Sequence, residues 1–128
     1  MADAARAKKI LLIDDDPVVI SLYTALFRHN GFQVESASDG EEGLERLRAS
    51  APDAVVLDLS MPKVNGLQWL QAVRADGRHE KIPIVILTTS ELGLTAQAAK
   101  NAGALAVLSK FRADPDKVVE SVVAALTS

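Results

Sequence analysis

The chain has 128 residues, no cysteine and a net charge of −3. This length suits one domain with its own core, and the lack of cysteine excludes disulfides and thiolate metal sites. The small negative charge argues against direct nucleic-acid binding, and no apolar run approaches the roughly 18–20 residues that span a bilayer. We therefore expect a globular domain of the reducing cytoplasm, without membrane insertion.

Short apolar runs alternate with segments of helical period along the chain. Residues 1–7 are expected to form a flexible arm, and residues 8–128 the domain. Continuous apolar runs, which suit strands buried on both faces of a parallel sheet, occupy 10–13, 54–57, 84–87 and 105–108. The alternating run 32–37 suits a sheet edge. Helical period is found in the segments 17–30, 38–47, 65–75, 95–102 and 114–126.

Several side chains have a structural interpretation. Asp16 before Pro17 and Asp114 before Pro115 are typical helix caps. Ser38 and Glu41 have the spacing of a capping box. Further along, Trp69 at helical spacing is expected in the core. The basic residues near the end of the 65–75 segment are expected to form a solvated rim: Arg74, Arg78 and Lys81.

The strand–helix order, repeated five times, predicts a parallel sheet with helices on both faces. Ligands bind such sheets beyond the carboxyl ends of the strands. The residues found there are carboxylates, hydroxyls and one ammonium: Asp14-Asp15-Asp16, Asp58, Thr88-Thr89-Ser90 and Ser109-Lys110.

This set of side chains points to phosphoryl chemistry. Clustered carboxylates repel one another, and a hard divalent cation such as Mg²⁺ relieves the repulsion. A lysine supplies a point charge for a phosphoryl oxygen, and a carboxylate can itself be the nucleophile. Phosphoryl transfer needs mainly positioning and charge neutralisation. The sequence therefore predicts a Mg²⁺-dependent phosphoryl site.

The chain resembles the receiver domain of two-component response regulators over about residues 8–127. The match is carried by Asp14-Asp15 after ILLI, D-x-x-M-P-x-x-x-G from Asp58 to Gly66, Thr88 after PIVIL, Gly103-Ala104, and Lys110 after LAVLS. The resemblance implies a doubly wound, flavodoxin-like (βα)5 fold with strand order 2-1-3-4-5.

The resemblance also implies a phosphorylation reaction. Asp58 would accept a phosphoryl group from a sensor histidine kinase or a histidine phosphotransfer protein. The altered face, about residues 91–127, would be read by an unidentified downstream protein. The chain would promote only its own phosphorylation and dephosphorylation, so we do not expect an enzyme acting on other substrates.

The same resemblance assigns the remaining site residues. Asp15, Asp58 and the backbone carbonyl of Ser60 would ligate Mg²⁺ directly, and Asp14 would act largely through a bound water. Thr88, favoured over Thr89 and Ser90, would hydrogen-bond the phosphoryl group, and Lys110 would pair with it.

Two positions depart from the family's pattern. Receivers usually have Lys-Pro where this chain has Lys110-Phe111. A cis bond there would cost roughly 2.5–4 kcal/mol, so the chain either accepts strain or takes another path. The strand position that commonly holds Tyr or Phe is Val107. Valine is small and stiff at χ1, so the usual rotamer switch is expected to be absent.

Two other functions stay open. One is a phosphorylation-independent interaction module, which Val107 and the missing proline would suit. The other is a small Mg²⁺ hydrolase with an aspartyl nucleophile, which is disfavoured because we find no cap domain to enclose a substrate. The chain ends soon after the last expected helix, so we expect either a stand-alone regulator or an excised domain.

Overall fold

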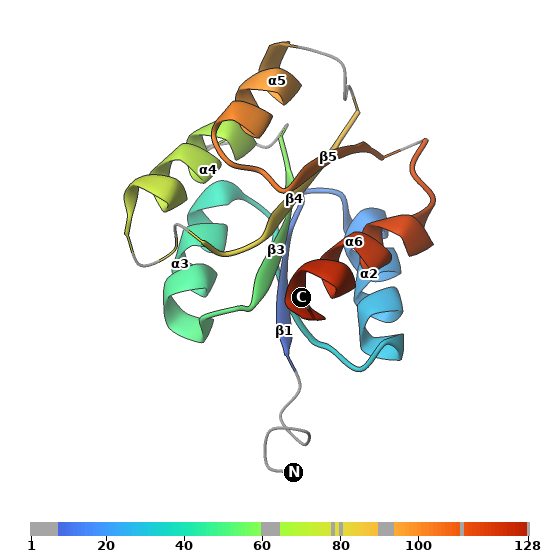
Figure 1. Cartoon of the computed structure of the whole chain (residues 1–128). Coiled ribbons are helices and arrows are strands. Elements are labelled where there is room, and N and C mark those ends of the chain that lie inside the picture. Colours follow the sequence, from blue (N-terminus) through green and yellow to red (C-terminus); the bar gives the residue numbers. More distant parts are fainter. Residues whose placement is uncertain are drawn as a thin grey trace.

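The computed structural model describes residues 8–59, 65–77, 79, 81–89, 94–110 and 112–127. Within these ranges five strands alternate with five helices (Figure 1). Their bounds are β1 Lys9–Ile13, α2 Pro17–His29, β2 Gln33–Ala37, α3 Gly40–Ser50, β3 Ala54–Asp58, α4 Gly66–Ala75, β4 Ile84–Thr88, α5 Leu94–Asn101, β5 Ala106–Ser109 and α6 Pro115–Thr127. The predicted alternation is confirmed. The expected arm, residues 1–7, lies outside the described residues.

The strands form one parallel sheet in the order β2-β1-β3-β4-β5, which confirms the predicted fold class. The continuous apolar runs of β3 and β4 are buried at every position. The alternating run forms β2 at one edge, where its first residue is exposed. Because the strands are parallel, all five carboxyl ends meet at one edge of the sheet.

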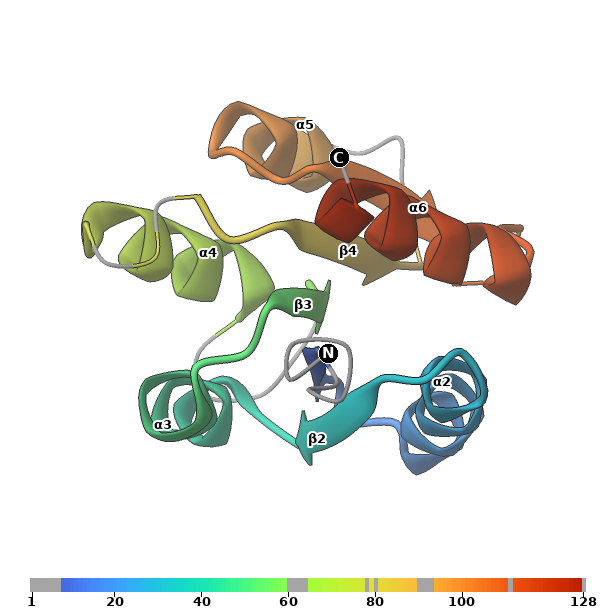
Figure 2. The same ribbon diagram turned by 60° about the horizontal axis from the view of Figure 1, so that its bottom comes forward.

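Helices cover both faces of the sheet (Figure 2). Helices α2 and α6 pack on one face, and α3, α4 and α5 pack on the other. Successive strand residues point to opposite faces, so each strand contributes to both cores. Phe27 and Trp69 are fully buried on opposite faces, which confirms the core prediction for Trp69. No helix among the described residues is both long and apolar enough to cross a membrane.

Two of the predicted helix caps are confirmed. Asp16 Oδ1 accepts the backbone N–H of Val18 at 2.9 Å, and Asp114 Oδ1 accepts that of Asp116 at 2.9 Å. Such a cap typically contributes about 1 kcal/mol because it satisfies a helix N–H that has no partner within the helix.

Two structural predictions are wrong. Helix α3 is capped by Asp39, whose Oδ1 accepts the Glu42 N–H at 2.9 Å, one residue later than the predicted pair. An aspartate suits this place because its charge also complements the helix dipole. The prediction of a solvated rim is wrong for Arg74, which is half-buried because its guanidinium donates to two backbone carbonyls of neighbouring loops. Lys81 is exposed as predicted, and Arg78 lies outside the described residues.

Candidate functional site

The alternation of the strands brings three predicted site residues to the same side of the sheet edge. Asp14, Asp58 and Lys110 each lie two positions beyond a residue that packs against α2 and α6. Because side chains alternate with a period of two, all three project toward that layer. Their strands β1, β3 and β5 are separated in sequence, and only the sheet order brings them together.

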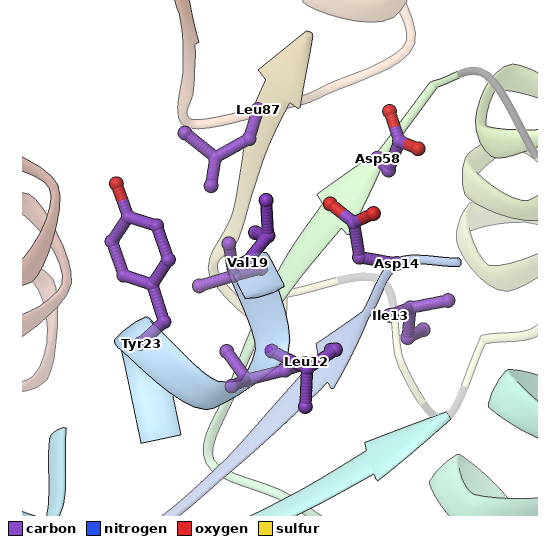
Figure 3. A pocket seen from close by; sticks show the side chains of 9 residues that line it. Leu12, Ile13, Asp14, Val19, Tyr23, Asp58 and Leu87 are labelled. Carbon is purple, nitrogen blue, oxygen red and sulfur yellow. The ribbon is translucent and has the colours of Figure 1, made fainter. Parts of the chain in front are cut away.

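Lys110 lies between two buried carboxylates. Its Nζ is 2.9 Å from Asp14 Oδ2 and 3.3 Å from Asp58 Oδ2. Asp14 is 4% exposed and Asp58 is 2% exposed, and Figure 3 shows both carboxylates at the ends of their strands. Charges buried to this extent require close partners, so the ammonium compensates charge that would otherwise destabilise the fold.

Apolar side chains lie beside the carboxylates of Asp14 and Asp58 (Figure 3). Leu12, Tyr23 and Leu87 line a cavity of about 10 Å³ that also touches Asp14 and Asp58. This volume admits at most one water molecule. The apolar wall lowers the local dielectric constant around both carboxylates, which strengthens their ion pairs with Lys110.

The environment of Lys110 shifts its pKa. Burial alone would lower the pKa of the ammonium, but hydrogen bonds and charge from Asp14, together with those from Asp58, outweigh it and raise the pKa above 10.5. Lys110 therefore carries its positive charge throughout the neutral pH range, as a group that pairs with a phosphoryl oxygen must.

Asp15 completes an oxygen-rich cluster suited to a metal ion. Each of Asp14, Asp15 and Asp58 offers one carboxylate oxygen, and these oxygens all lie within 4.8 Å of one another. Asp15 is exposed, beside a groove of about 340 Å³ between α2 and α3. Mg²⁺ prefers one or two carboxylates with several waters and phosphate oxygens, so the donor set fits this ion. Ser60, the predicted carbonyl ligand, lies outside the described residues.

Thr88 is buried at the carboxyl end of β4, with 4% of its surface exposed. It lies one residue beyond Leu87, the register partner of Asp58. Its carbonyl accepts the backbone N–H of Lys110 at 2.9 Å, so Thr88 also positions the lysine. Thr89 is exposed, whereas Ser90 lies outside the described residues.

Two small residues, Ser109 at the end of β5 and Gly66 at the start of α4, shape the site more than their sequence indicates. Ser109 Oγ accepts the N–H of Arg112 at 3.1 Å, so the side chain beside Lys110 is tied to backbone three residues further along the chain. A Cβ on Gly66 would lie 2.2 Å from the Asp58 carbonyl oxygen, so only glycine fits there. Family resemblance located Gly66, but the reason for glycine is visible only in three dimensions.

The structure describes only one of the two positions that depart from the family's pattern, Val107 and not Phe111. Val107 is 8% exposed and packs in the α3–α4–α5 layer, among residues that include Ile86, Ala96 and Ala99. Phe111 lies outside the described residues, so the path of the chain after Lys110 stays a prediction.

The fold and site define a class: a doubly wound α/β domain with a carboxylate–lysine centre at the carboxyl edge of its sheet. The family model of the response regulator receiver domain matches residues 10–123. The chain belongs to this family and is a receiver domain of two-component signalling, the class of protein that interacts with kinases or phosphotransfer proteins and with downstream targets. Members generally bind Mg²⁺ through acidic residues.

Individual relatives differ in how much they share with this chain. Protein PilH of Pseudomonas aeruginosa is 31% identical over 118 residues, which cover 92% of this chain and 97% of PilH. Response regulator MprA of Mycolicibacterium vanbaalenii is 38% identical over 96 residues, or 75% of this chain, and the match spans only 41% of MprA. The structure of the chemotaxis response regulator CheY4 of Vibrio cholerae aligns with a TM-score of 0.86 at 27% identity, covering 94% of this chain and 100% of CheY4.

Proposed function

We propose that Asp58 accepts a phosphoryl group from the phosphohistidine of a sensor histidine kinase or histidine phosphotransfer protein, with Mg²⁺ bound at the acidic cluster. The supporting observation is the position of Asp58: a buried carboxylate at the end of β3, 3.3 Å from the Lys110 ammonium and within the three-carboxylate group.

The reaction is a transfer between two nucleophiles. An Asp58 carboxylate oxygen forms a bond to phosphorus while the bond from phosphorus to the histidine nitrogen breaks. The imidazole, protonated on its other ring nitrogen, leaves with the electron pair of the broken bond and thereby becomes neutral. Lys110 neutralises negative charge beside the new acyl phosphate. Mg²⁺ held by Asp15 and Asp58, with Asp14 acting largely through a bound water, would supply further charge neutralisation.

The remaining predicted roles belong to the same proposal. Thr88 donates a hydrogen bond to a phosphoryl oxygen, and the Ser60 carbonyl ligates the metal. The acyl phosphate then alters the face of α5, β5 and α6, which a downstream protein reads in the cytoplasm. The domain promotes only its own phosphorylation and hydrolysis, so it is not an enzyme with a separate substrate.

A constitutive interaction module is the second candidate, and Val107 favours it. A small β-branched side chain in the same buried cluster as Ala96 and Ala99 has few rotamers and little volume with which to repack the core. In that case the docking face would have one conformation with or without phosphate.

Incubation with acetyl phosphate and Mg²⁺, followed by intact-protein mass measurement, tests the proposal. We expect a gain of one phosphoryl group in the wild type and in the control Asp116→Asn, which alters an exposed carboxylate. The gain should be absent in Asp58→Asn and in EDTA. No gain in the folded wild type, with partner binding unchanged by phosphodonor, would favour the interaction module.

A further inference from the structure

Helix α4 begins directly against the backbone that carries the acceptor. The N–H of Gly66, its first residue, donates to the Leu59 carbonyl at 3.0 Å. A Cβ on Gly66 would approach the Asp58 carbonyl oxygen to 2.2 Å and Leu59 Cα to 2.6 Å. Since no side chain separates the two backbones, a displacement at Asp58 must also displace the start of α4.

Helix α4 is built as a stiff element. A reciprocal capping box joins Asn65 and Gln68 at its start, and such a box satisfies two helix-terminal N–H groups at once. Trp69, Leu70 and Val73 anchor one face of the helix in the core with at most 2% of their surface exposed. The ten residues of α4 span about 15 Å, so the helix connects the acceptor with a distant part of the domain.

Arg74, in the last turn of α4, donates hydrogen bonds to the backbone of two loops. Its Nη1 donates to the His79 carbonyl at 3.0 Å, and its Nη2 donates to the Gly103 carbonyl at 2.9 Å. Partial burial lowers the pKa of the guanidinium, but an arginine keeps its charge in proteins. Hydrogen bonds from a charged donor are stronger than those between neutral groups, so this contact links α4 to Gly103.

Gly103 lies at the joint between α5 and β5. Its φ of +102° ends α5, and a Cβ at this position would approach Arg74 Nε to 3.1 Å. Two residues later the Leu105 N–H donates to the Ile84 carbonyl at 2.8 Å, where the chain starts to pair with β4. The joint therefore feeds directly into β5, which leads to Lys110.

These contacts form a continuous series from the backbone of Asp58, through α4 and Arg74, to the joint between α5 and β5. We call this series the route. We propose that α4 transmits a displacement of the Asp58 backbone to the α5–β5 joint, and that Arg74 is the positioning residue that makes this transmission possible. The trigger rests on the proposed phosphorylation of Asp58. The route does not use Val107, which explains how a receiver with a small residue at that position could still signal.

Arginine-to-methionine substitutions test the route. Arg74→Met keeps the aliphatic stem but removes both donors, and Arg48→Met makes the same change at an exposed residue of α3. Backbone amide exchange over residues 94–108 would be measured in each variant, with and without acetyl phosphate and Mg²⁺. Phosphoryl uptake would be followed by mass.

We expect Arg74→Met to take up phosphoryl at a rate within about twofold of wild type. Phosphorylation should change its amide exchange over residues 94–108 by less than half of the change seen in the wild type. Arg48→Met should show the full wild-type change. If Arg74→Met showed the same phosphorylation-dependent change as the wild type, the proposal would be overturned, even if its amides exchanged faster before phosphorylation. Arg74 would then only stabilise the fold.

If Arg74→Met does not fold, Arg74→Lys replaces it, because lysine keeps one donor nitrogen. This variant should lose part of the phosphorylation-dependent change, and a full change would overturn the proposal.

Failure of the proposed function is distinguishable from failure of the route. A wild type that takes up no phosphoryl contradicts the function alone. The route would then be tested with Gly66→Ala, which displaces the Asp58 backbone sterically. This substitution should alter exchange over residues 94–108 when Arg74 is present and much less in the Arg74→Met background. Equal alteration in both backgrounds would overturn the route.

Discussion

The ammonium of Lys110 lies nearer to Asp14 than to Asp58, at 2.9 Å from Asp14 Oδ2 against 3.3 Å from Asp58 Oδ2. Asp14 Oδ1 also accepts the backbone N–H of Asp16 at 2.9 Å. Asp14 thus orders both the lysine and the residue that caps α2.

We expect Lys110→Met to lower the free energy of unfolding by about 3 kcal/mol in metal-free buffer, because breaking a buried pair leaves uncompensated charge. Adding Asp14→Asn should restore part of the loss, because one buried charge is then removed. Urea denaturation in EDTA measures both effects. The control Lys117→Met, at an exposed ion pair, should change stability by less than about 0.5 kcal/mol. Equal losses at the two lysines would contradict the pairing.

Gly66→Ala is expected to destabilise the protein by about 1–3 kcal/mol or more, because its Cβ would collide with the backbone at Asp58 and Leu59. Gly77→Ala is the matched control, since a Cβ there meets nothing within 4 Å. Thermal or urea unfolding compares the two. If both alanines prove neutral, the close approach of α4 to β3 is wrong.

The three consecutive aspartates should respond differently to alanine. Asp16→Ala removes the cap on Val18 and should cost roughly 0.5–2 kcal/mol of stability while leaving phosphoryl uptake mostly intact. Asp15→Ala alters an exposed side chain of the metal cluster and should abolish Mg²⁺-dependent uptake with little loss of stability. Loss of Mg²⁺ binding in a folded Asp16→Ala protein would contradict this division.

Tyr23 should titrate abnormally. Burial and the negative charge of Asp114 raise its pKa above 10.0, and it is the only tyrosine, so the tyrosinate absorbance reports it alone. The folded protein binds this proton more tightly than the unfolded chain, so stability should fall as the pH rises above 10.0. The raised pKa of Lys110 acts in the same direction, since its contribution is lost as the pH rises through the folded-state pKa.

Asp114→Asn tests the cause of the Tyr23 shift. Asparagine still caps α6, so the helix should persist while the charge is removed. We expect the titration midpoint to move only part of the way back, because burial is the larger cause. If the tyrosinate absorbance of the wild-type protein instead titrated at the usual tyrosine pKa of 10.0, the Tyr23 phenol would not be buried in solution.

The periodicity of the sequence was sufficient to predict the alternating elements and the parallel sheet. Continuous apolar runs can be satisfied only where both faces are covered, and Asp16-Pro17 and Asp114-Pro115 are strong local start signals. At α3 the spacing of Ser38 and Glu41 indicated a capping box one residue too early. Local chemistry suits either residue as a cap, and the structure uses Asp39.

The sequence by itself determined which residue types reach the carboxyl edge of the sheet, because strand ends and turn residues are encoded locally. Only the tertiary structure decided that Lys110 contacts both Asp14 and Asp58, since the order of the strands sets which ends are neighbours. The same holds for Arg74, which is an ordinary surface cation in the sequence. Its role depends on carbonyls at His79 and Gly103, and backbone groups carry no signature in a sequence.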